Sequence, residues 1–120
     1  MAVTVPIKRV LYVFDRSGKS VERYFTNNIG IRIHSVAISL KGEYIVAGSW
    51  RRLSVFERSN AREVWGYRIG KFVRSVAISP DGKYIVAGCD DKNVYLFSMD
   101  GSLLWRYKTG YDVESVAIRL

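Results

Sequence analysis

The sequence of 120 residues has one cysteine, Cys89, and one histidine, His34. A single cysteine excludes an intrachain disulfide, and without a Cys/His cluster we expect no structural zinc site. One histidine gives no convincing histidine-based triad, and neither of the phosphate-loop patterns GxGxxG and GxxxxGKS/T occurs. We therefore expect a protein that is not an enzyme, that has no cofactor and no metal, and in which Cys89 is a small buried residue rather than a nucleophile.

Long apolar runs are also missing. No apolar stretch approaches the roughly 20 residues that cross a bilayer, and the start MAVTVPIKRV lacks the basic-then-apolar order of a signal peptide. These absences favour a cytoplasmic protein without a membrane partner. The sequence is still 48% apolar, which is enough for a packed core. Its formal charge of +8 favours anionic partners, but only weakly, because the basic residues are scattered in ones and twos.

What the sequence does have is an internal repeat with a period of 40 residues. The segments HSVAIS (34–39), RSVAIS (74–79) and ESVAIR (114–119) follow one another at this spacing. A fixed period of this size is the signature of a repeat architecture. The same step relates KGEYIVAG (41–48) to DGKYIVAG (81–88), Gly30 to Gly70 and Gly110, Trp65 to Trp105, and Tyr67 to Tyr107.

Each repeat unit has the pattern of four short strands. β-Branched and aromatic residues dominate, no stretch has helical periodicity, and turn residues divide the unit at 80–82, 90–92 and 99–101. The expected strands of the second complete unit are VRSVAIS, KYIVAG, NVYLFS and SLLWRYK. Four antiparallel strands in about 40 residues make one blade of a β-propeller, and a blade needs neighbours on both of its faces. The sequence therefore predicts an all-β propeller fold.

The first 26 residues fit this pattern when they are shifted by 83 positions. The shift places AVTV on IVAG, LYVF (11–14) on VYLF (94–97), and Gly18 on Gly101. The chain then opens at the second strand of a blade and closes on a lone first strand, and it holds three blades' worth of strands. The predicted segments are 1–29, 30–69 and 70–109, followed by a closing first strand at 110–120.

The stretch VRSVAISPDGKYIVAGCDDKNVYLFS (73–98) resembles the repeat of WD-repeat propellers in order and spacing, although Phe97-Ser98 stands in place of the Trp-Asp pair. The fourth strands, REVWGYRIG and GSLLWRYKTG, instead resemble those of quinoprotein dehydrogenase-like propellers. There, a Trp near the blade end packs against the next blade, which implies interblade packing for Trp65 and Trp105. The quinone cofactor of that family is not expected, because three short blades do not visibly supply its ligands. Both resemblances imply architecture rather than function.

Three blades are fewer than the four to eight that usually close a propeller. We therefore expect self-association, in which two chains supply a six-bladed ring and residues 111–120 pair beside residues 2–5. These residues belong either to the same chain or to a partner chain. We favour the partner, because exchange covers an apolar strand edge that would otherwise template pairing. The alternatives are a different ring size and a chain that is an excised or broken part of a larger propeller.

Recognition residues are expected where the repeat is broken, since framework positions have to repeat. In WD-repeat propellers, the loop entering the first strand and the loop between the second and third strands lie on one face near the central channel. Carried over by position, the resemblance implies a set of channel-face residues. These are Arg32, His34, Phe72, Arg74, Asp112 and Glu114, with Trp50, Arg51 and Arg52 from the second loop.

The stretch 50–52 is the sharpest local hint. Trp and Arg are enriched among the residues that dominate interfaces, and they also stack on bases or bind phosphate. The alternative is that Trp50 covers a blade edge and the arginines are solvated. These features predict a non-enzymatic scaffold that binds another macromolecule, foremost a protein, through the channel face. The second hypothesis is nucleic-acid binding through Trp50, Arg51, Arg52 and Arg74, and the third is a propeller fragment without a function of its own.

Overall fold

The computed structural model describes the backbone of strands 2–5, 10–14 and 20–25, and it describes residues 17–18, 33–59 and 62–119 with their side chains. The described residues form strands and turns, and no helix among them is long and apolar enough to span a membrane. The predicted all-β fold class is confirmed.

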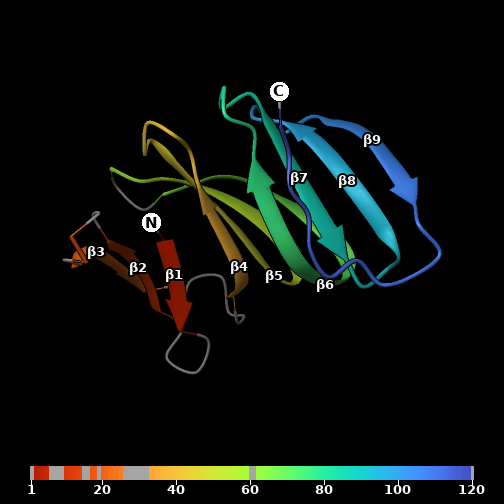
Figure 1. Ribbon diagram of the computed structural model, residues 1–120, viewed down its shortest axis with the longest axis horizontal. Helices are drawn as coiled ribbons and strands as arrows, with labels where there is room; N and C mark the ends of the chain where they lie inside the picture. Colours follow the sequence, from red (N-terminus) through yellow and green to blue (C-terminus); the bar gives the residue numbers. More distant parts are fainter. Residues whose placement is uncertain are drawn as a thin grey trace.

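The strands pair in chain order, and every pair is antiparallel (Figure 1). Such sequential pairing is what short connections between strands favour. The first sheet contains β1 (Ala2–Val5), β2 (Val10–Phe14) and β3 (Ser20–Phe25). The second contains β4 (Ile33–Ile38), β5 (Tyr44–Glu57), β6 (Glu63–Ile78), β7 (Tyr84–Cys89), β8 (Asn93–Ser98) and β9 (Leu103–Lys108).

Two blades share the second sheet, because β6 passes from one to the other. It pairs with β5 between Glu63 and Phe72 and with β7 from Val73 onward. The last part of β6 with β7, β8 and β9 gives the four strands predicted for the later blade. β4, the two halves of β5 and the start of β6 give the four strands of the earlier blade.

β5 is a hairpin whose two halves are joined without a separate loop. Its ends lie side by side, since the backbone N–H of Arg58 donates to the carbonyl of Glu43 at 3.0 Å. The chain reverses at Arg51, whose φ of 61° lies in the left-handed region.

The structure thereby corrects the loop predicted at 50–52, which lies inside β5. The connection from Gly48 to Phe56 is one residue shorter than that from Gly88 to Phe97 in the next blade. The shorter connection leaves no residue outside the strand, whereas the longer one separates β7 from β8.

A shared irregularity relates the three repeats. Where the third strand of each pairs with the fourth, the register shifts between Val13 and Phe14, between Val55 and Phe56, and between Leu96 and Phe97. Because the bulge occurs at the same position in every copy, it is a property of the repeat rather than a local defect. It confirms that β2 and β3 follow the predicted shift of 83 positions.

β1 departs from that shift by one residue. It pairs Ala2 with Val13 and Val5 with Val10, whereas the shift of 83 applied to the ladder of β7 and β8 would pair Ala2 with Phe14. By its pairing, AVTV therefore corresponds to VAGC (86–89) and not to IVAG. The connection between β1 and β2 is one residue longer than that between β7 and β8, and a slip of one residue exchanges the two faces of a strand.

The core lies between the two blades of the second sheet. Repeat-equivalent residues of the second strands are buried on both faces, which explains their unbroken apolar sequence. Gly48 leaves room for the next blade, because a Cβ there would lie 2.6 Å from Cγ1 of Val73. The buried members of the second strands are Ile45, Val46, Ala47, Ile85, Val86 and Ala87.

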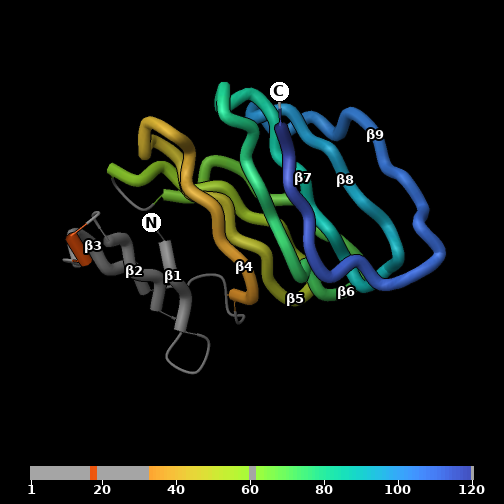
Figure 2. Tube along the Cα trace, in the orientation of Figure 1, coloured from red at the N-terminus to blue at the C-terminus, as the bar shows by residue number. Residues whose placement is uncertain are grey.

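Residues 111–119 run along the later blade and pair with no strand of the described chain, β1 included (Figures 1 and 2). The backbone N–H of Val116 donates to Oγ of Ser75 at 3.1 Å, repeating the 3.2 Å bond from Val76 to Ser35 one blade earlier. The segment thus lies where the first strand of a further blade belongs. The pairing with residues 2–5 of the same chain is not formed.

Candidate binding surface

Three aromatic rings meet at the reversal of β5. Phe72 is the central ring, placed opposite Trp50 by the register of β5 and β6. His34 contacts it edge-on with the ring centroids 4.6 Å apart, and Trp50 does so at 4.4 Å. Trp50 nevertheless keeps 42% of its surface exposed. We call His34, Trp50 and Phe72 the aromatic cluster.

Arginines surround the Trp50 side of this cluster. The guanidinium carbon of Arg51 lies 5.2 Å from the centroid of the Trp50 ring, within the range of a cation–π contact. Arg68 stands opposite Arg52 in the β5–β6 register, and these residues line an open hollow of about 280 Å³ with Trp50. Arg52 forms an ion pair with Glu63 at 2.7 Å. The positive charge of this cationic hollow therefore comes mainly from Arg51 and Arg68.

The neighbouring blade presents mixed charge instead. Arg74 forms an ion pair with Asp90 and donates a hydrogen bond to it. This hydrogen bond and the charge of Asp90 raise the pKa of Arg74, and the charges of Asp112 and Glu114 raise it further. Asp112 and Glu114 are themselves exposed. One cation is thus paired with one carboxylate and influenced by the charges of two more.

The structure divides the predicted site residues into two groups. Phe72 contacts both His34 and Trp50, and Arg51 lies over the Trp50 ring, whereas Asp112 and Glu114 act on Arg74 through their charges. Arg52 donates hydrogen bonds to Glu63 on the next strand, so it is paired within the blade rather than simply solvated. Trp50 meets both interpretations, since it packs against Phe72 and stays accessible. Arg32 lies outside the described residues.

The sequence reasoning missed three members of this surface: Glu63, Arg68 and Asp90. Each joins through cross-strand pairing, which depends on register rather than on the repeat alone. Asp90 was interpreted only as a turn residue. Val73 pairs with Cys89, however, so Arg74, which follows Val73, comes to lie beside Asp90, which follows Cys89. Alignment of the strands within one blade is the signal that would have revealed these contacts.

Two buried groups of the later blade, a thiol and a phenol, are held in their neutral forms. Cys89 is fully buried, as expected, and burial raises the pKa of its thiol, so that the reactive thiolate is disfavoured. Tyr95 is also buried, and desolvation followed by its hydrogen bond to Asp91 raises its pKa to about 12. Both groups therefore remain neutral near pH 7.

Turn carboxylates satisfy backbone donors. Asp81 accepts from the N–H of Lys83 and Asp100 from the N–H of Ser102, each at 3.0 Å, and Asp91 accepts from the N–H of Asn93. This geometry is typical of Asx turns. Among the described residues, no group of three or more His, Cys, Asp or Glu side chains is placed to hold a metal.

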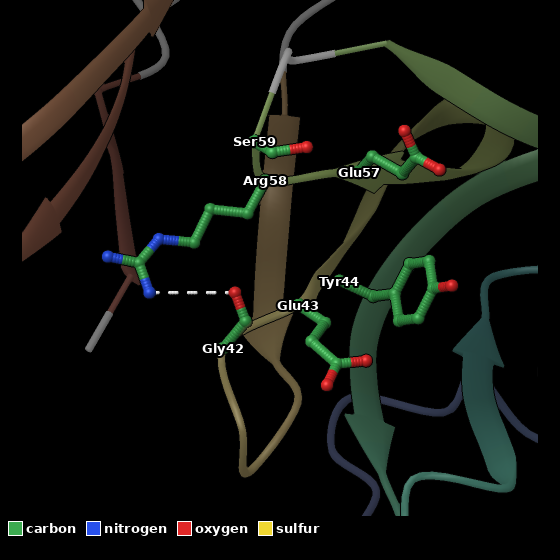
Figure 3. A pocket seen from close by; sticks show the side chains of 6 residues that line it. All are labelled: Gly42, Glu43, Tyr44, Glu57, Arg58 and Ser59. Atoms are coloured by element: carbon green, nitrogen blue, oxygen red, sulfur yellow. Dashed lines mark hydrogen bonds between the residues drawn. The ribbon is translucent and has the colours of Figure 1, made fainter.

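A second hollow lies at the opposite end of the β5 hairpin (Figure 3). It measures about 430 Å³ and is lined by residues 42–44 and 57–59. Its charged side chains have both signs, and Arg58 reaches back to the carbonyl of Gly42 at 3.5 Å. Because Glu43 and Glu57 line it together with Arg58 and the ring of Tyr44, this end lacks the excess of positive charge that marks the first hollow.

Comparison with known proteins agrees with this architecture. Residues 66–98 match the WD40 family, described as "WD domain, G-beta repeat", whereas no curated protein matches the chain. Among the solved structures, the crystal structure of RRP9 WD40 repeats is similar, with a TM-score of 0.75 at 13% sequence identity. The similarity covers 88% of this chain but only 34% of that chain. The likeness of the fourth strands to quinoprotein propellers stays a prediction. The fold of this chain is therefore that of a β-propeller of the WD-repeat type.

Proposed function

We propose that this chain is a non-enzymatic scaffold that binds another protein through the aromatic cluster and the charged residues beside it. WD40 repeats generally mediate protein binding as scaffolds. The observation that carries the proposal is Trp50, which is held edge-on by Phe72, covered on one side by Arg51, and still 42% exposed. A rigid, accessible Trp beside Arg is the type of residue pair that dominates protein interfaces.

The charge distribution favours a protein over a polyanion. Positive charge gathers at Arg51 and Arg68, while one blade further on Arg74 is paired with Asp90 and feels the charges of Asp112 and Glu114. A uniform chain of phosphates would meet repulsion at the acidic side, whereas a protein surface can offer both signs. The partner is therefore expected to present acidic groups to one blade and basic groups to the next.

Site-specific photocrosslinking tests this surface. A photoreactive amino acid replaces His34 in one variant and Leu40 in a second; Leu40 is 83% exposed and lines a separate hollow formed by residues 39–41, 43–44 and 80–82. A protein crosslinked from His34 but not from Leu40 is purified, and its affinity is measured for the natural chain and for Trp50→Ala. We expect a loss of at least tenfold, and an affinity within twofold of the natural chain would exclude Trp50 from the interface.

A second function, nucleic-acid binding, is favoured by one observation, the cationic hollow beside an accessible indole ring. Bases stack on aromatic rings, and arginines bind phosphate. A fluorescent single-stranded oligonucleotide titrated at 50 and 200 mM salt is the probe. Affinity that falls steeply with salt and is lost in Arg51→Glu/Arg68→Glu, but not in Lys41→Glu/Lys83→Glu, supports this function. No detectable binding at 50 mM salt removes it.

A third proposal follows from coverage: the chain corresponds to about one third of the RRP9 chain that it resembles. A segment of a larger propeller contributes blades to a face that other blades complete. Sequencing of the adjacent coding region tests this, since continuation of the 40-residue repeat places residues 1–120 within a longer ring. Stop and start codons directly at its boundaries contradict it.

A further inference from the structure

Contact between the two complete blades shows what covers the outer strands of a blade. The indole N–H of Trp65, on the fourth strand of the earlier blade, donates to the carbonyl of Met99 at 2.9 Å. Its ring lies 5.7 Å from that of Phe97, and a Cβ on Gly101 would approach it to 3.2 Å. Tyr67 contacts Phe97 edge-on at 4.9 Å. One blade therefore needs Phe97, the Met99 carbonyl and Gly101 of the next blade as its cover.

The equivalent residues of the later blade have no such cover in the described chain. Trp105 and Tyr107 occupy the repeat positions of Trp65 and Tyr67, and they are 48% and 66% exposed. Leu103 and Leu104 on the same strand are exposed as well. Residues 111–119 run along β7 of the same blade and have an unpaired edge. Exposed apolar side chains and an open strand edge are each typical of an interface.

The sheet of β1, β2 and β3 has the features that this surface lacks. β2 and β3 repeat the register and the bulge of β8 and β9 at a shift of 83 positions. Phe14 then stands at the position of Phe97 and Gly18 at that of Gly101, and both glycines have positive φ, 87° and 102°. β1 pairs only with β2 in the described chain, so its other edge is the position of a first strand.

We infer that a second copy of this chain covers the exposed face of β9, and that its β1 pairs with residues 111–119 in a mutual exchange. The ladder of β6 and β7, moved by the repeat, gives the register. Val113 lies opposite Val5 of the partner subunit, and Ala117 lies opposite Ala2 of the partner subunit. Each chain contributes three blades' worth of strands, and two chains give six blades, within the range in which propellers close. The exchange is symmetric, as in a two-fold dimer.

Charge complementarity identifies the occupant as this chain itself. The four-residue segments 31–34, 71–74 and 111–114 are equivalent by the repeat. The second residue of one segment interacts with the fourth residue of the preceding segment: Phe72 contacts His34, and the charge of Asp112 acts on Arg74. By repeat position, the residue that would continue this series in a second copy is Arg32 of the partner subunit, whose charge is opposite to that of Glu114. The acidic terminal strand thus has a basic counterpart in the same sequence.

Disulfide trapping between separately labelled chains tests the register. Both chains carry Cys89→Ser, which removes the natural thiol; Ser is chosen because Ser49 stands at the equivalent position of the preceding blade. One chain adds Ala2→Cys, and the other adds Ala117→Cys. After mixing and oxidation, we expect a covalent species of twice 13.7 kDa. Leu40→Cys replaces Ala117→Cys in the control, because Leu40 is exposed and remote from the proposed ladder, and it is expected to give none.

Two outcomes overturn the inference. The first is the absence of crosslinks in the mixture. The second is an intrachain disulfide in a single chain that carries both Ala2→Cys and Ala117→Cys. Such a bond would show that residue 117 pairs with residue 2 of its own chain. Light scattering of the unmodified chain provides an independent measurement. A folded species of 13.7 kDa, or a trimer or larger ring, contradicts the two-chain assembly.

Charge reversal tests the choice of partner. Arg32→Glu places one acidic residue opposite another, Glu114, across the interface. Because like charges repel, we expect the dimer dissociation constant to rise about fivefold. Adding Glu114→Arg restores opposite charges and recovers most of this loss. A double variant that is weaker than either single variant contradicts the contact, whatever the ligand of the channel face proves to be.

Discussion

The indole N–H of Trp65 and the backbone carbonyl of Met99 form a 2.9 Å hydrogen bond that joins two blades. The donor lies on the fourth strand of one blade, and the acceptor directly follows the third strand of the next. A Trp that packs against a core usually finds a partner for its N–H. Partly buried Trp65 finds this partner on the next blade, so the bond links the two blades.

This contact predicts a graded loss of stability. Trp65→Phe keeps an aromatic ring against Phe97 but removes the hydrogen bond, so it should lower the free energy of unfolding by about 1 kcal/mol. Trp65→Ala also removes the ring and should cost about 3 kcal/mol. Urea unfolding measures both values. Equal losses for the two variants would mean that the ring contributes nothing to the interface.

Glycines at the blade interface give a second prediction. A Cβ at Gly48 would lie 2.6 Å from Cγ1 of Val73, and a Cβ at Gly88 would lie 2.5 Å from Cγ1 of Val113. Overpacking of this kind costs about 2 kcal/mol when the neighbouring strand is fixed. Val73 is fixed by its ladder, whereas Val113 has no ladder and is held through the hydrogen bond of its backbone N–H to the carbonyl of Cys89 at 3.2 Å, so pairing of residues 111–119 would fix it further. In the two-chain ring, both Gly→Ala variants should lose similar stability, and a silent Gly88→Ala would show a free terminal segment.

Stability should decrease at alkaline pH. The pKa of Tyr95 is raised from 10.0 to about 12, so the folded state favours the neutral phenol. This stabilisation is complete below pH 10 and is lost as the pH rises toward 12, by about 2 kcal/mol. Burial of Cys89 raises its thiol pKa above the ordinary value of 9.0, so the decline begins near pH 9.

Urea unfolding between pH 8 and 11 measures this decline, and two variants separate its causes. Cys89→Ser should remove the part that begins near pH 9, and Tyr95→Phe the part that begins near pH 10. An unchanged profile in both variants would assign the decline to other groups.

Two buried serines make a matched pair. Ser54 and Ser49 are both 1% exposed, but Oγ of Ser49 donates to the carbonyl of Arg52 at 3.1 Å, whereas Oγ of Ser54 contacts no hydrogen-bond partner among the described residues. Ser54→Ala should therefore raise the unfolding free energy by about 1 kcal/mol, and Ser49→Ala should lower it by a similar amount. Thermal or urea unfolding measures the difference, and destabilisation by Ser54→Ala would reveal a partner for its hydroxyl.

Strands and their order followed from the sequence because the responsible signals are local. Alternation of apolar residues and turn residues such as Gly82 and Gly101, both with positive φ, fix where each strand begins and ends. The 40-residue period then indicated that Trp65 belongs between blades, as the contact with Phe97 shows. Buried Cys89 followed from its equivalence to Ser49 in the preceding blade.

Contacts across strands and blades were decided only by the tertiary structure. The one-residue slip of β1, the tight reversal at Arg51 and the ion pair of Arg74 with Asp90 depend on register, which a repeated sequence leaves open by one or two residues. The same sequence position also has different surroundings in each repeat: Trp65 is covered by the next blade, and Trp105 is exposed. A repeat determines its own strands, whereas the neighbour that covers its face is a property of the assembled blades.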